Sequence, residues 1–188
     1  MNLVERVKRI LLSPQTEWEV IDTEQTTTTE LYTGYILPLA AIGPIASTIG
    51  MVLFGQRIAF TSLTNPVPLS TAITRGVAAY VLALISVFVV TQLISLLAPG
   101  FGGQKNDVQA LKAAAYSSTA AWIGGVFGLI PALGIVSLIF LLYSLYLLYV
   151  GLPIVMKVPQ DRAMGYTAVV IIGYIVVFLI MGAVLSAF

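Results

Sequence analysis

The chain has 188 residues, of which 59% are hydrophobic and only 9% are charged. A typical soluble domain carries roughly 25% charged residues, so these few charges cannot cover a soluble fold of this size. The net charge of +1 gives no electrostatic basis for binding nucleic acid. Cysteine and histidine are both absent, which excludes disulfides, thiol catalysis and histidine acid–base chemistry. The composition therefore predicts an integral membrane protein.

Residues 1–30 form a polar segment that we expect to lie at the cytoplasmic face. Residues 2–12 place Leu3, Val7 and Ile10 at helical spacing, with most of the charges opposite. This pattern predicts a short amphipathic helix in the membrane interface, its cations near anionic headgroups.

A second short helix is expected directly after Ser13-Pro14. The run from Thr16 to Glu19 fits a capping box that would open this helix, and Trp18 on its apolar face would act as an interfacial anchor. We favour two surface helices that orient the first span. A docking platform for a cytoplasmic partner is the alternative.

Six of the eight carboxylates lie within the first thirty residues. Glu17, Asp22 and Glu24 could approach one another and bind a hard cation, which prefers oxygen ligands. No spacing typical of a calcium loop is present, so we favour a solvated polar face and expect no metal or cofactor.

Charge-free intervals define the membrane spans. A span needs about 20 mostly apolar residues, and the interval 113–156 is long enough for two, with a Gly/Pro turn in its middle. The sequence therefore predicts an all-α, polytopic bundle of five transmembrane helices over residues 31–188. The five helices are expected near 31–54, 74–98, 108–129, 133–156 and 164–187.

The distribution of Lys and Arg predicts the orientation of the bundle. With the N-terminus inside, the inner segments hold seven of these cations and the outer segments hold only two, Arg57 and Arg75. By the positive-inside rule, the N-terminus is cytoplasmic and the C-terminus is external.

Small residues and prolines indicate how the helices pack. Gly124 and Gly128 form a G-x-x-x-G pair in the third predicted span, which lets backbones approach closely. We expect this face to pack within the bundle, where it would let Leu138 and Leu142 come close; a homodimer contact is the alternative. Pro38 and Pro44 are expected to interrupt the first span, and Pro153 to kink the fourth.

Polar groups inside the predicted spans are few, and no ionisable side chain lies at the centre of one. This weakens the case for an ion-coupled transporter. The absence of His, Cys and paired intramembrane acids leaves no catalytic set, so we expect no enzyme. The residues that would line a polar crevice, if one exists, are Gln92, Tyr116, Ser117, Tyr143 and Tyr146.

Three stretches carry a resemblance to a known family: residues 16–24, residues 35–39, and residues 149–153 followed by 157–166. They resemble the Yip domain family, the Ypt/Rab-interacting membrane proteins, and specifically its prokaryotic branch. The resemblance implies five spans and a cytoplasmic N-terminus. Eukaryotic relatives bind prenylated Rab-type GTPases, but this chain has a short N-terminal part and lacks their Asp-Leu-Tyr-Gly-Pro motif. The GTPase partner is therefore not transferred.

Together these features favour a non-enzymatic protein of a bacterial inner membrane that organises protein partners or lipids. The expected partners are membrane lipids and either a second copy or another membrane protein. The alternative is a small transporter or lipid-translocating protein that uses a polar intramembrane crevice.

Overall fold

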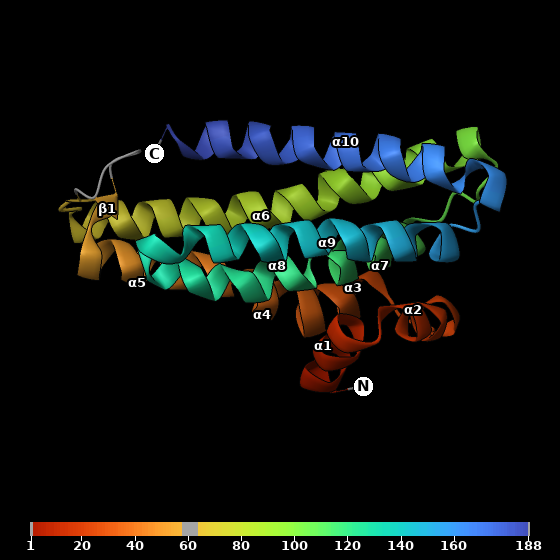
Figure 1. Ribbon diagram of the computed structural model, residues 1–188, viewed down its shortest axis with the longest axis horizontal. Coiled ribbons are helices and arrows are strands. Elements are labelled where there is room, and N and C mark those ends of the chain that lie inside the picture. The colour runs from red at the N-terminus through yellow and green to blue at the C-terminus, as the bar shows by residue number, and fades with distance from the viewer. Residues whose placement is uncertain (1, 58–63, 188) are drawn as a thin grey trace.

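The computed structural model describes residues 2–57 and 64–187. In Figure 1 the long helices run along one common axis, and two short N-terminal helices lie against the side of that bundle. Within the described residues, four segments are long and apolar enough to cross a membrane: Thr28–Phe54, Leu69–Phe101, Gly134–Val155 and Gln160–Leu185. The predicted all-helical architecture is confirmed, whereas the count of five spans is not.

The N-terminal segment forms helices α1 (Leu3–Leu12) and α2 (Pro14–Thr23). The Asn2 side chain caps α1 by accepting a hydrogen bond from the backbone of Val4. Helix α2 begins with a proline in its first turn, where a missing N–H costs nothing.

The capping box predicted at Thr16 is wrong. The Thr16 hydroxyl donates back to the Ser13 carbonyl instead of accepting from the helix backbone. A capping box does occur one element later, where the side chain of Thr27 accepts from Glu30 N and the Glu30 carboxylate accepts from Thr27 N. It opens the first long helical segment.

That first segment is interrupted, as expected from its prolines. It comprises α3 (Thr28–Leu31), a π-helical turn η1 (Tyr32–Ile36), α4 (Leu37–Ala40) and α5 (Ile42–Phe54). The π turn lies directly before the Leu37-Pro38 pair, and the break at Ala41 precedes Pro44; proline cannot donate to the preceding turn.

The second long helix, α6 (Leu69–Leu97), starts earlier than predicted, so Arg75 lies in its second turn. It continues into a 3₁₀ turn, η2 (Ala98–Phe101). Between α5 and α6, two-residue strands β1 (Gln56–Arg57) and β2 (Thr64–Asn65) pair antiparallel.

The third predicted span, residues 108–129, is not one continuous helix. It is divided into α7 (Asp107–Ser117), α8 (Thr119–Gly124) and a 3₁₀ segment η3 (Gly125–Leu129). The hydroxyls of Ser117 and Ser118 both donate to the Ala114 carbonyl at the first break. Such back-bonding competes with the helix ladder and bends it.

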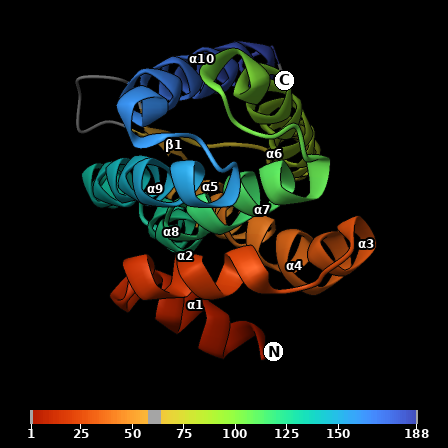
Figure 2. The same cartoon turned by 90° about the vertical axis from the view of Figure 1, so that its right-hand side faces the viewer.

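The last two helices are α9 (Gly134–Val155) and α10 (Gln160–Leu185), and a short 3₁₀ turn η4 (Pro131–Leu133) leads into α9. Successive long segments alternate in direction along the bundle axis in Figure 1. Viewed end-on in Figure 2, α1 and α2 lie on the side of the bundle opposite α10.

Glycines set the closest helix contacts of the 107–129 segment. A Cβ on Gly124 would lie 2.3 Å from the Phe140 Cβ of α9, and one on Gly125 would lie 2.7 Å from the Gly43 Cα of α5. A Cβ on Gly128 would meet Ser47 of α5 at 3.4 Å. The glycine face therefore meets α5 and α9 of the same chain.

The expected approach of Leu138 and Leu142 to these glycines is wrong, because both side chains are exposed on the outer face of α9. Phe140, two residues before Leu142, is the one that turns inward onto Gly124. Since α9 is apolar all round, its sequence gives no periodic signal that would identify the inward face.

We expect Gly124→Ile to lower the thermal stability of the detergent-extracted protein by about 1–3 kcal/mol or more, since its Cβ would overlap Phe140. Melting curves at two protein concentrations should show the same shift. The control is Gly134→Ile, because a Cβ there meets nothing within 4 Å. A change confined to the monomer–dimer balance would contradict the intramolecular contact.

Candidate functional site

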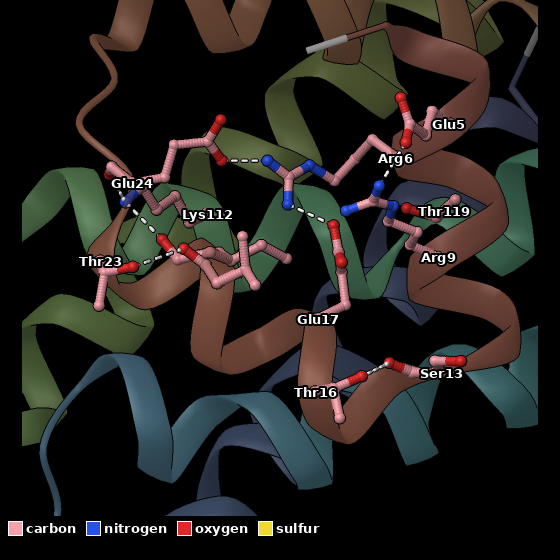
Figure 3. A network of polar contacts seen from close by, with 12 residues as sticks. Glu5, Arg6, Arg9, Ser13, Thr16, Glu17, Thr23, Glu24, Lys112 and Thr119 are labelled. Atoms are coloured by element: carbon pink, nitrogen blue, oxygen red, sulfur yellow. Dashed lines mark hydrogen bonds and ion pairs between the residues drawn. The ribbon is translucent and has the colours of Figure 1, made fainter.

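Helices α1 and α2 are joined by a buried ionic contact (Figure 3). The Arg6 guanidinium on α1 donates to the carboxylate of Glu17 on α2 and to that of Glu24, which follows α2. Arg6 and Glu17 are each only 3% exposed. One cation thus ties together two helices and the linker that leads to the bundle.

Lys112 on α7 attaches this helical pair to the bundle. Its ammonium Nζ donates to the Ile21 carbonyl at 2.8 Å and to the Glu24 carbonyl at 2.6 Å. The neighbouring Gln109 donates from Nε2 to the Asp22 carbonyl at 3.0 Å. The last carbonyls of a helix have no partner within it and carry partial negative charge, so α7 caps the end of α2.

Aromatic packing fills the space beneath α2. Trp18 is fully buried and lies against Gly151 of α9, where an added Cβ would be 2.1 Å from the indole ring. The Trp18 ring meets Tyr116 edge-on at 6.3 Å, and Tyr116 meets Tyr35 at 4.7 Å between ring centroids. Arg6 lies over the Tyr116 ring at 5.3 Å, a cation–π distance.

Two further contacts fix the N-terminal pair. The Tyr143 hydroxyl in the middle of α9 donates to the Leu11 carbonyl at the end of α1, at 2.7 Å. Ile10 of α1 is fully buried in the hydrophobic core. The apolar face of α1 therefore packs against protein, not outward as an interfacial helix would place it.

A polar cavity of about 320 Å³ lies between α1, the linker after α2, and the π turn η1. Arg6, Glu24 and Glu30 supply its charged groups, and a π turn beside a cavity is a common feature of functional sites. Its full lining is Leu3, Arg6, Glu24, Gln25, Thr26, Glu30, Leu31, Gly34, Tyr35 and Tyr116.

The alternative of a cation cluster formed by Glu17, Asp22 and Glu24 does not fit the structure. Glu17 and Glu24 pair with Arg6, and Asp22 pairs with Lys157 at the start of the last loop. The favoured solvated face is wrong for Glu17, which is buried. Over residues 2–57 and 64–187, no group of three or more His, Cys, Asp or Glu side chains is placed to hold a metal ion.

The structure brings Tyr143 and Tyr146 into contact, with ring centroids 5.5 Å apart, but it does not bring the five expected crevice residues together. Tyr116 belongs to the contact under α2, and Ser117 donates to the Ala114 carbonyl of its own helix. The Tyr143 hydroxyl donates to the Leu11 carbonyl, and Tyr146 is 42% exposed on the outer face of α9. Gln92 lies on α6 and lines neither this polar cavity nor the apolar one described below.

Pro153, singled out as a kink, lies inside α9 two residues after Gly151. Helix α9 continues past Pro153 to Val155. The Pro153 carbonyl accepts a hydrogen bond from the backbone N–H of Val158 in the following turn.

The position of Arg6 on the apolar face of its helix was a sequence signal that an amphipathic interpretation of residues 2–12 overlooks. Arg6 is three residues after Leu3 and four before Ile10, so it shares their helix face. Glu17 and Glu24 are seven residues apart, with Ile21 between them. A charged residue within each apolar stripe was the sign that the two helices meet through an ion pair.

Comparison with protein families gives a match to the Yip1 domain over residues 8–182. Comparison with curated proteins and with solved structures gives no match. The matched region begins within α1, includes α2 and the bundle, and ends near the close of α10. Lys112, Glu17 and Glu24 lie inside it, whereas Arg6 lies just before it. Because it covers nearly the whole chain, this protein belongs to the Yip1 domain family of membrane proteins.

Proposed function

We propose that this Yip1 domain protein is non-catalytic and organises protein partners or lipids in a membrane. The observation that carries the proposal is the docking of α1 and α2 onto the bundle through the buried contacts of Arg6 and Lys112. A helical pair fixed in this way presents one defined surface, and a preorganised surface loses little conformational freedom on binding.

The outer surface of the N-terminal pair has the mixed character of a binding surface. Leu12 is 78% exposed at the end of α1, and Val4 and Val20 are also exposed. Charged side chains, among them Lys8 and Glu19, lie between these apolar groups. Apolar groups with a polar rim are typical of protein interfaces.

A transporter is the weaker reading. Its polar path would need hydroxyl and amide groups that converge within the bundle. Instead Tyr143 donates to the Leu11 carbonyl, Ser117 donates within its own helix, and Tyr146 is exposed on α9. The buried cations Arg6 and Lys112 are both engaged by the protein itself. No polar path supports the movement of a solute through the described bundle.

We further propose that residues 107–129 form a fifth span and that the protein lies in a bacterial inner membrane. At about 1.5 Å per residue, this segment is long enough for a hydrocarbon core of roughly 30 Å. It lies along α5 and α9, with Gly125 against Gly43. The Lys and Arg distribution then favours a cytoplasmic N-terminus and an external C-terminus.

Topology reporters distinguish five spans from four. A reporter fused after Gln160 should lie in the cytoplasm, whereas reporters after Ala132 and Phe188 should lie outside. If residues 107–129 stayed on the cytoplasmic side, the reporter after Ala132 would be cytoplasmic and the five-span proposal would fail.

Removing Arg6 should release the N-terminal pair. Arg6→Ala leaves the buried Glu17 carboxylate without its partner, which typically costs about 3–5 kcal/mol. Limited proteolysis of the protein in mild detergent should then cleave residues 1–30 faster. The matched control, Arg9→Ala, removes an exposed pair with Glu5 that is worth roughly 0–1 kcal/mol, so its cleavage should stay at the wild-type rate.

The proposed function itself is tested by photo-crosslinking in cells. A photoreactive residue at Leu12 or Val20 should give discrete products with a protein or a lipid headgroup, and Arg6→Ala should abolish them. The same residue at Ile139, exposed on α9, should not give those products. Identical products at all three positions, or products that survive Arg6→Ala, would argue against a docking surface on α1 and α2.

A further inference from the structure

A second cavity, of about 320 Å³, lies among α6, α8, α9 and α10 on the other side of the bundle. The glycines of α10 show where it begins. A Cβ on Gly173 would lie 2.6 Å from Leu93 of α6, so the two helices are in close contact there. A Cβ on Gly182, nine residues later on the cavity wall, would meet nothing within 4 Å. The C-terminal part of α10 therefore stands away from the bundle.

Small residues on the opposite walls keep the cavity open. Ala79 and Ala83 of α6 face it, as do Ala114 of α7 and Ala121 of α8. No large side chain reaches across from these positions to fill the space that α10 leaves.

The residues that line the cavity favour an apolar ligand. Ser86 donates to the Leu82 carbonyl at 2.8 Å and Ser118 to the Ala114 carbonyl at 2.7 Å, each within its own stretch of helix. Tyr174 also lines the cavity, and most of the other wall groups are apolar, among them Val90, Leu141 and Val177. A polar ligand would lose its hydrogen bonds on entering without gaining equivalent ones.

The surface around the cavity is apolar and exposed. Val81 and Ile85 of α6 and Phe178 and Leu179 of α10 are exposed apolar residues next to it. In a membrane protein such faces contact acyl chains, which are the most abundant molecules able to enter.

We propose that this cavity holds one acyl chain of a membrane lipid. The inference deepens the proposed function, and it rests on lipids being among what the protein organises. A volume of about 320 Å³ lies at the small end of ligand sites. Water is disfavoured because apolar cavities stay dry.

Trp122 on the cavity wall provides a direct probe. The chain has one other tryptophan, Trp18, which is fully buried beneath α2. Bromine on an acyl chain quenches an indole that it contacts. The protein is reconstituted into vesicles of phosphatidylcholine with or without dibrominated chains, and the difference between wild type and Trp122→Phe gives the Trp122 signal. We expect brominated chains to quench it.

Variants that fill the cavity distinguish an acyl chain bound inside it from lipid that only surrounds the protein. Gly182→Phe places a ring in open space on the cavity wall and should abolish most of the Trp122 quenching. Ala83→Leu, from the α6 wall, should act in the same direction. The control Leu179→Phe alters the exposed face of α10 and should leave quenching unchanged.

Several outcomes would overturn the proposal. Wild-type Trp122 that is not quenched shows that no acyl chain reaches the cavity. Quenching that persists in both Gly182→Phe and Ala83→Leu, with unchanged melting temperatures, shows that the lipid lies elsewhere. An oligomeric state shifted by Gly182→Phe assigns the cavity to a second copy. None of these results would alter crosslinking at Leu12, so failure here is separate from failure of the N-terminal docking surface.

Discussion

The arrangement of helices α1 and α2 depends on one guanidinium. Arg6 is enclosed by Glu17, Glu24 and the face of Tyr116, and no other cation among the described residues bridges α1 to the linker after α2. Buried charge is tolerated only when it is paired and hydrogen-bonded. The two helices must therefore lie where both carboxylates reach Arg6, and that geometry turns Trp18 toward Gly151.

The close packing of the bundle depends instead on glycines, which have no side chain to keep the helices apart. Gly43 and Gly125 bring α5 and η3 into backbone contact, and Gly124 admits Phe140. Lipid offers no hydrophobic driving force for helix association, so close packing must supply it. Other small residues, among them Ala83 and Gly182, line the cavity beside α10.

Much of the fold followed from the sequence, because long apolar runs and helical periodicity fix α1, α9 and α10. The break at Ser118 did not, since it depends on the hydroxyls of Ser117 and Ser118 donating to the Ala114 carbonyl and not to solvent or a neighbouring helix. The candidate site was harder still. Pairing Lys112 with the end of α2 requires knowing which helices are neighbours, and no local pattern carries that information.

The long sequence separation of these contacts has a consequence for biosynthesis. The hydrogen bond to the Ile21 carbonyl cannot form until Lys112, 91 residues later, has been synthesised. The bond to the Leu11 carbonyl likewise requires Tyr143, 132 residues later. At roughly 5–20 residues per second, this delay is on the order of ten seconds. Through that interval the carbonyls at the ends of α1 and α2 lack their final donors, and the Asp22 carboxylate lacks Lys157. The first part of the protein to be made is thus among the last to take its final place.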